Sequence, residues 1–136
     1  MTKQRVLILC TGNSARSQMA EGFLRHLAGD RFDVFSAGTK PTGLSSYAVQ
    51  VMSEVGIDIS RQRSKSVDEF ANQQFEYVVT VCDRARESCP FFPGSGKRLH
   101  RSFEDPAAAA PQAHLEAFRR VRDQIASWLK EFAGDN

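Results

Sequence analysis

Short apolar runs alternate with amphipathic helical segments along this sequence, and the alternation restricts the fold more than any other feature. The apolar runs with strand character cover residues 5–10, 32–38, 75–82 and 97–103. Apolar residues recur at helical spacing in residues 17–27, 45–55 and 115–132, and residues 66–73 form a further short helical segment. Strands that alternate with helices predict an α/β fold in which a four-stranded parallel sheet is flanked by helices on both faces.

The composition is that of an ordinary globular protein. The chain has 136 residues, of which 41% are hydrophobic and 25% are charged, so we expect one domain (residues 1–136) whose core needs no disulfide or metal. A formal net charge of +2 is too small to indicate nucleic acid as a partner. The apolar run at residues 6–10 is too short for a signal peptide, and no segment approaches the ~20 apolar residues of a membrane span. The sequence therefore predicts a cytoplasmic protein whose partners include neither a membrane nor nucleic acid.

The chain has three cysteines, Cys10, Cys82 and Cys89. An odd number of cysteines in a domain that needs no cross-links indicates a chemical rather than a structural use. Cys10 and Cys82 each end a predicted strand, and the carboxyl ends of parallel strands meet at one edge of a sheet, where the turn after Phe103 also falls. A zinc site is disfavoured, because six residues separate Cys82 from Cys89 and the usual spacing is roughly two to four.

The loop C-T-G-N-S-A-R-S, residues 10–17, leaves the first predicted strand and opens the first helix. A loop of this length at a helix N-terminus can turn successive backbone N–H groups toward one centre and so bind an anion. Gly12 relieves the tight backbone, Asn13 tolerates a positive φ, and the Arg16 guanidinium can contact two oxygens at once. The sequence therefore predicts a site for a phosphate-like oxyanion, formed by Thr11, Gly12, Asn13, Ser14, Ala15, Arg16 and Ser17.

The same N–H dipoles and the charge of Arg16 fall on the sulfur of Cys10. We expect them to stabilise the thiolate and to make Cys10 a nucleophile near neutral pH, with Ser17 able to donate its hydroxyl to the sulfur. The plainer interpretation is a buried cysteine at a strand end beside a surface arginine. A non-catalytic oxyanion-binding module is a remote alternative, because such a module does not need a cysteine inside its loop.

Several stretches occur here in the order found in the low-molecular-weight protein tyrosine phosphatase superfamily. They are V-L-I-L-C-T-G-N-S-A-R-S-Q-M-A-E-G at 6–22, S-A-G-T at 36–39, G-I-D-I-S at 56–60, V-T-V-C-D at 79–83 and E-D-P-A at 104–107. In detail the chain resembles the thioredoxin-coupled arsenate reductase branch. The resemblance implies that Cys10 is the nucleophile, Arg16 the oxyanion clamp and Asp105 the general acid and base. Without it, the Asp-Pro pair is as well explained as an ordinary turn or helix cap.

The resemblance also implies a relay of three cysteines. Cys10 forms an adduct with arsenic, Cys82 attacks Cys10 and releases arsenite, and Cys89 attacks Cys82, after which thioredoxin reduces the Cys82–Cys89 disulfide. The polar segment 83–88 is expected to be exposed and mobile. Alternatively, Cys82 is a core cysteine and Cys89 a chance loop residue. A glutaredoxin with glutathione is another candidate electron donor.

A phosphatase that hydrolyses phosphate monoesters through a phosphocysteine is the main alternative function. It shares Cys10, Arg16 and Asp105 with the reductase and needs only one cysteine and water. The phosphatase branch typically carries tyrosines just after its Asp-Pro, whereas this chain has Ala107 and Ala108. The site therefore resembles one for a small inorganic oxyanion, with weak hydrolysis of activated aryl phosphates.

The chain departs from its relatives at two positions. Many have a further cysteine where this chain has Ala15, which the relay does not use. Some reductases bind a potassium ion through groups that match Asn13, Glu21 and Ser36, but Lys65 stands here where they have an acidic ligand. A lysine ammonium beside Glu21 can take the place of that cation, so we expect neither a metal nor a cofactor.

Overall fold

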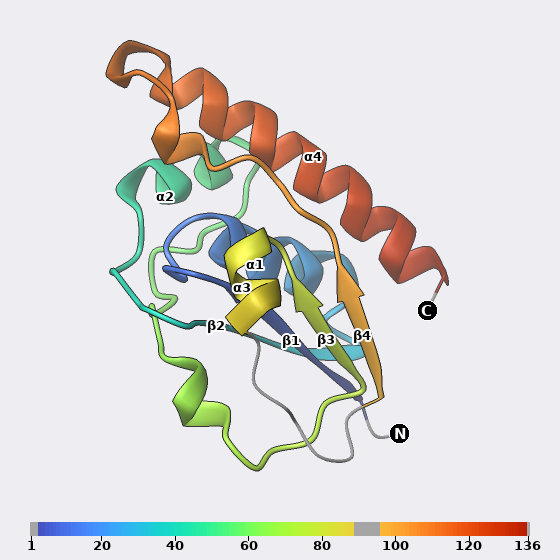
Figure 1. Cartoon of the computed structure of the whole chain (residues 1–136). Helices are drawn as coiled ribbons and strands as arrows, with labels where there is room; N and C mark the ends of the chain where they lie inside the picture. The colour runs from blue at the N-terminus through green and yellow to red at the C-terminus, as the bar shows by residue number, and fades with distance from the viewer. Residues whose placement is uncertain (1–2, 89–95, 136) are drawn as a thin grey trace.

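The computed structural model describes residues 3–88 and 96–135. Within these residues the strands are β1 (Gln4–Cys10), β2 (Phe32–Gly38), β3 (Tyr77–Thr80) and β4 (Lys97–His100). The α-helices are α1 (Arg16–Ala28), α2 (Ser46–Glu54), α3 (Asp83–Ser88) and α4 (His114–Asp135). Three short 3-10 helices, η1 (Val67–Phe70), η2 (Pro106–Ala108) and η3 (Pro111–Ala113), lie in the connections between them. Figure 1 shows the sheet with the long helix α4 running beside it.

The strands form one parallel sheet in the order β2-β1-β3-β4. The central strand β1 is buried from residue 6 to residue 10, because it is covered on both faces and paired on both edges. Its last residue, Cys10, pairs with Gly38 at the end of β2. All strands point the same way, so their carboxyl ends form one edge where the loops after β1, β2, β3 and β4 meet.

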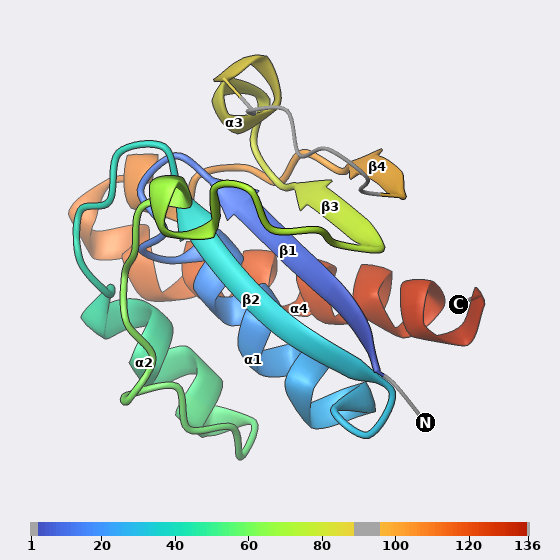
Figure 2. The same cartoon turned by 90° about the horizontal axis from the view of Figure 1, so that it is seen from below.

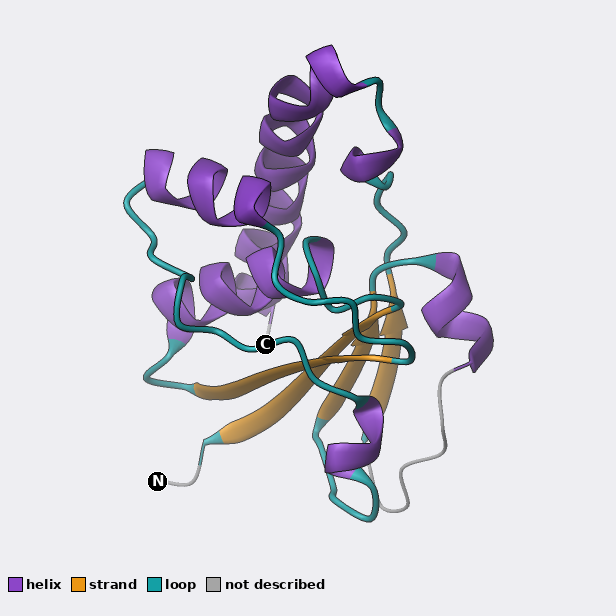
Figure 3. Cartoon of the chain, turned by 90° about the vertical axis from the view of Figure 1, so that its left-hand side faces the viewer, coloured by secondary structure: helices purple, strands orange, loops and turns teal. Residues whose placement is uncertain are grey.

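Helices cover the two faces of the sheet unequally. Figure 2 shows α1, α2 and α4 on one face, and α4 packs on α1 and α2. The apolar stripe of α4 is buried there, with Phe118, Val121, Ile125, Leu129 and Phe132 among its buried side chains. The other side carries the short helices η1 and α3, as Figure 3 also shows. The predicted α/β class and four-stranded parallel sheet, with helices on both faces, are confirmed.

Some predicted elements have different limits. The strands expected over 75–82 and 97–103 are shorter, so Cys82 lies just beyond β3 rather than in it. The segment expected over 66–73 is the single 3-10 turn η1. Residues 83–88, predicted only to be polar and exposed, form α3; apolar spacing could not predict this helix, because among residues 83–86, whose burial is described, only Ala85 is buried. In the described part of the chain, no helix combines the length and the apolar character needed to cross a bilayer.

Candidate active site

Hydrogen bonds to the surrounding chain hold the carbonyl groups of residues 10–15 on the outside of the oxyanion loop, residues 10–17. Those of residues 10, 11, 12 and 14 accept hydrogen bonds from the backbone N–H groups of Thr39, Lys40, Thr42 and Ser45, at 3.3, 2.9, 3.0 and 3.0 Å. The carbonyls of Asn13 and Ala15 accept from the Gln18 amide at 3.0 Å and from the Met19 N–H at 2.8 Å. In a peptide unit the N–H points opposite to the C=O. Holding the carbonyls on the outside therefore aims the N–H groups toward the inside of the loop.

A cavity of about 660 Å³ lies on that inner side. Its lining includes Cys10, Thr11, Gly12, Ser14, Ala15, Arg16, Cys82 and Asp105. Within the described residues, the backbone N–H groups of residues 12–15 donate to no protein acceptor. Convergent N–H groups at the start of a helix, here α1, make a site for an anion, since each carries a partial positive charge. The site is formed before any ligand enters, because the outer hydrogen bonds already fix the backbone.

Two residues permit the tight path of this loop. Asn13 is fully buried and has φ +46°, the left-handed conformation expected for it. Gly38, at the end of β2, lies against the loop so closely that a Cβ there would be 2.5 Å from the Thr11 carbonyl oxygen and 2.9 Å from the Asn13 nitrogen. A side chain at position 38 would therefore displace the loop.

Arg16 connects the loop to the turn that follows β4. Its guanidinium donates to the carbonyl of Phe103 at 3.1 Å and lies 4.0 Å from the Asp105 carboxylate. The other carboxylate oxygen of Asp105 accepts the N–H of Ala107 at 3.0 Å and caps η2. Asp105 thus has the capping contact of the plainer interpretation, and it also lines the cavity beside Arg16, as a general acid must.

The fold brings two of the three cysteines together. Cys10 and Cys82 are both free thiols, they line the same cavity, and each shifts the pKa of the other. The Thr11 hydroxyl is 3.4 Å from the Cys82 sulfur. Cys89 lies outside the described residues. No hydrogen bond joins Ser17 to Cys10 within the described residues; the Ser17 hydroxyl instead accepts from the Asn13 amide at 2.8 Å.

The two thiols have pKa values that are shifted in opposite directions. The hydrogen bond from Cys10, with further ones from Thr11 and the Ala85 N–H, outweighs burial and lowers the pKa of Cys82 to about 5. The hydrogen bond to Cys82 and burial raise the pKa of Cys10, although Arg16 acts in the opposite direction. The direction at Cys10 is opposite to the lowered pKa expected from the loop, because the neighbouring Cys82 thiol competes with Cys10 for the negative charge.

We predict that iodoacetamide alkylates Cys82 with a midpoint near pH 5, since the thiolate forms as the pH rises through its pKa. The rate of modification at Cys82, followed by peptide mass spectrometry in Cys89→Ser protein, should be at its plateau by pH 7 and fall below pH 5. Cys10→Ala removes the largest stabilising hydrogen bond and should move the midpoint upward. A midpoint near the free-cysteine value of about 8.5 in the parent protein would refute the prediction.

The residues that match a potassium site are already occupied by hydrogen bonds. Asn13 Oδ1 accepts from the Lys65 backbone N–H at 2.9 Å and from the Gln18 amide at 3.0 Å. The Ser36 hydroxyl accepts from the Asn13 amide at 2.9 Å and donates to Glu21 at 2.6 Å. The Lys65 ammonium lies 3.6 Å from Glu21. A potassium ion needs several free oxygen ligands, so the residues present do not fit one.

Sequence reasoning did not identify the segment at residues 39–45 as part of the site. The segment serves mainly through its backbone N–H groups, which hold the carbonyls of the oxyanion loop. Thr42 and Ser45 also line the cavity. Backbone donors have no side-chain signature, and the only local signal is Ser45, whose hydroxyl caps α2 through the Ala48 N–H.

Comparisons with known proteins agree with this geometry. The family model described as low molecular weight phosphotyrosine protein phosphatase matches residues 5–135. The arsenate reductase of Bacillus subtilis (strain 168) is 46% identical over 135 residues, which cover 98% of this chain and 97% of that protein. The arsenate reductase of Halalkalibacterium halodurans is 45% identical with the same coverage. A solved structure of an arsenate reductase in the phosphate binding state superposes with a TM-score of 0.81 at 30% identity, covering 97% of this chain and 98% of the other.

Proposed function

The chain belongs to the low molecular weight phosphotyrosine protein phosphatase family, and within that family we propose that it is an arsenate reductase. In this proposal, arsenate is reduced to arsenite through Cys10, Cys82 and Cys89, and thioredoxin returns the oxidised enzyme to its thiol form. The names of the relatives that are 45% and 46% identical over nearly the whole chain support the reaction.

One observation carries the proposal: a second free thiol, Cys82, lines the oxyanion cavity together with Cys10. Hydrolysis through a phosphocysteine needs one thiol and water. Reduction needs a second thiol that attacks the first sulfur, because two electrons must pass to arsenic and a disulfide must form. The low pKa of Cys82 makes it the thiolate for that second attack.

In the first step, the loop N–H groups and the Arg16 guanidinium bind the arsenate oxygens. The Cys10 sulfur then attacks arsenic and forms an S–As bond. The thiol loses its proton, and one arsenate hydroxyl group accepts a proton from Asp105 and leaves as water, so that an S–H and an As–O bond break while an S–As and an O–H bond form. Arg16 and the N–H groups also stabilise the charge that builds up on the oxygens during the attack.

In the second step, the Cys82 thiolate attacks the Cys10 sulfur. A Cys10–Cys82 disulfide forms, the S–As bond breaks, and its electron pair stays on arsenic, which leaves as arsenite. Cys89 then attacks Cys82 and releases Cys10 for the next cycle. A dithiol partner, thioredoxin in this proposal, reduces the Cys82–Cys89 disulfide.

Hydrolysis of phosphate monoesters is the second candidate activity, because Cys10, Arg16 and Asp105 suffice for it. The residue after Pro106 that lines the cavity is Ala107, which offers a phenyl ring no aromatic surface. We therefore propose only weak hydrolysis of activated aryl phosphates.

Two assays on the same preparation test the proposed function. The first couples arsenate-dependent NADPH oxidation to thioredoxin and thioredoxin reductase, and the second follows hydrolysis of p-nitrophenyl phosphate. We expect arsenate reduction to dominate, and replacing thioredoxin by glutaredoxin with glutathione to slow it. Efficient hydrolysis together with no arsenate-dependent oxidation with either donor would assign the chain to the phosphatases.

A further inference from the structure

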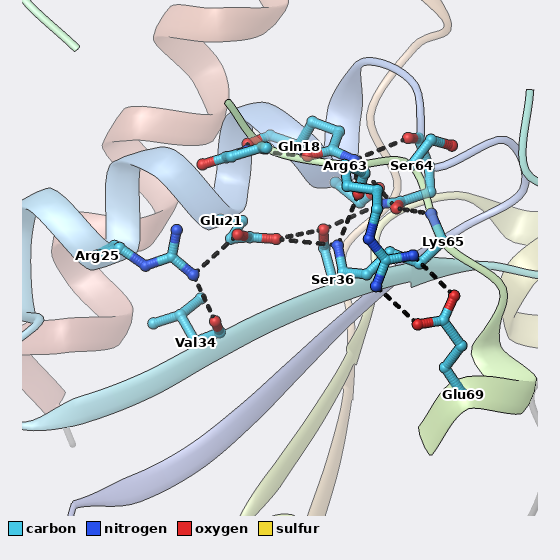
Figure 4. Close-up of polar contacts among 12 residues, drawn as sticks. Gln18, Glu21, Arg25, Val34, Ser36, Arg63, Ser64, Lys65 and Glu69 are labelled. Carbon is cyan, nitrogen blue, oxygen red and sulfur yellow. Dashed lines mark hydrogen bonds and ion pairs between the residues drawn. The ribbon is translucent and has the colours of Figure 1, made fainter. Parts of the chain in front are cut away.

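A buried carboxylate, Glu21, lies beneath the oxyanion loop, and the proposed reaction does not use it. Glu21 belongs to α1 and is 4% exposed. A buried carboxylate is strongly destabilising unless opposite charges and hydrogen-bond donors surround it. Figure 4 shows Glu21 between Arg25 on one side and Ser36 on the other, with Lys65 close by. The residues around Glu21 therefore supply the opposite charges and the hydrogen-bond donors that a buried carboxylate needs.

Two cationic side chains form ion pairs with this carboxylate, and they differ in their exposure to solvent. The Arg25 guanidinium is 2.8 Å from Glu21 Oε2, but its side chain is 52% exposed. The Lys65 ammonium is 3.6 Å from Glu21 Oε1, and its side chain is 12% exposed. Burial lowers the pKa of Lys65, and Glu21 opposes that shift. Water screens the outer pair, so the inner ammonium is the stronger counter-charge.

A chain of hydrogen bonds runs from the carboxylate to the oxyanion loop. Ser36 donates its proton to Glu21 Oε1 at 2.6 Å, which leaves its lone pairs to accept from the Asn13 amide at 2.9 Å. An ionised carboxylate can only accept, so its charge fixes the direction of the Ser36 hydroxyl. This chain of hydrogen bonds holds the side chain of Asn13, the loop residue whose own backbone φ is +46°.

The backbone of Lys65 holds the same region. Its N–H donates to Asn13 Oδ1 at 2.9 Å, and its carbonyl accepts from Gly38 N–H at 2.8 Å. The ammonium itself donates to the Arg63 carbonyl at 2.8 Å. Residue 65 therefore contacts Asn13 directly through its backbone and indirectly through Glu21 and Ser36.

We propose that Lys65 is a positioning residue whose ammonium pairs with the buried Glu21 carboxylate and thereby holds Asn13, and the oxyanion-binding N–H groups that follow it, in their binding geometry. The proposal deepens the proposed function, because it concerns how the same site obtains its affinity for an oxyanion. Lys65 never touches the oxyanion, since the ammonium lies behind the loop, beside Glu21. The Lys65 ammonium, which belongs to the chain itself, occupies the place beside the Glu21 carboxylate.

Lys65→Met keeps the length of the side chain and removes its charge. We expect the dissociation constant for inorganic phosphate, measured by titration calorimetry, and the KM for arsenate to rise about tenfold, while kcat changes less. Arg25→Met, which removes the exposed cation from the same carboxylate, is the matched control and should change both constants less than about twofold. The proposal would be overturned if the two variants lost phosphate affinity equally, or if Lys65→Met lost none. Phosphate titration requires no turnover, so its result stands even if arsenate is not the substrate.

A double substitution separates this role from a general loss of structure. Lys65→Met leaves a buried charge unpaired, whereas Lys65→Met with Glu21→Gln leaves a neutral amide whose oxygen can still accept from Ser36. We expect the double variant to bind phosphate more tightly than Lys65→Met and to unfold at a higher temperature. If the two substitutions weaken phosphate binding additively, Lys65 does not act through Glu21. That result would overturn the proposal even if Lys65→Met alone folds poorly.

An exogenous cation gives an independent measurement. Lys65→Ala opens space beside Glu21, and methylammonium is a small cation that carries the ammonium group which the variant lacks. Methylammonium chloride should lower the phosphate dissociation constant of Lys65→Ala toward that of the parent protein, and sodium chloride at equal ionic strength should not. Equal effects of the two salts would contradict a specific ammonium site at this position.

Discussion

Cys82→Ser protein should release no arsenite and yet hydrolyse p-nitrophenyl phosphate. In the proposed reaction, arsenite leaves only when the Cys82 thiolate attacks the sulfur of Cys10, and a serine hydroxyl cannot form the disulfide. Hydrolysis needs only Cys10, Arg16, Asp105 and water. The measurement is arsenite released per enzyme in a single turnover without thioredoxin, next to the rate of p-nitrophenol formation by the same sample.

Cys89→Ser is the matched variant, because it removes the other relay thiol and keeps the first disulfide. It should release about one arsenite per enzyme and then stop, even with thioredoxin present, and mass spectrometry should find a Cys10–Cys82 disulfide. Cys10→Ser should lose both activities while retaining phosphate binding. Sustained turnover of Cys89→Ser with thioredoxin, or arsenite release by Cys82→Ser, would rule out the three-cysteine relay.

Asp105→Asn should lower arsenate reduction by on the order of 10²-fold or more, because an amide cannot protonate the departing oxygen. The amide oxygen can still accept the Ala107 N–H, so the cap of η2 is kept. Hydrolysis of phenyl phosphate, whose leaving group needs a proton, should fall more than hydrolysis of p-nitrophenyl phosphate, whose leaving group does not. The relevant quantity is kcat for each substrate at saturation.

Glu104→Gln is a suitable control for Asp105→Asn. Glu104 is the adjacent carboxylate, but it pairs with Arg120 on the surface at 2.6 Å. Glu104→Gln should leave the rates of arsenate reduction, phenyl phosphate hydrolysis and p-nitrophenyl phosphate hydrolysis nearly unchanged. An arsenate rate in Asp105→Asn equal to that of the parent protein would leave Asp105 with only its capping role.

Most of the fold could be predicted from the sequence. β1 and β2 begin and end within a residue of the predicted limits, since buried strands and amphipathic helices leave a direct apolar pattern. β3 and β4 were predicted too long, because apolar residues continue past the point where strand pairing ends. α3 was not predicted, since a short helix of mostly polar residues has no such pattern.

The sequence by itself determined the oxyanion loop, because its eight residues, 10–17, are contiguous and their order fixes a turn, a positive φ at Asn13 and an arginine at the start of a helix. Only the tertiary structure decided that the pKa values of Cys10 and Cys82 shift in opposite directions, and that Phe103 and Asp105 meet Arg16. Hydrogen bonds and ion pairs act over about 3 to 4 Å. Their partners here are far apart in the chain, and sequence spacing does not specify such distances.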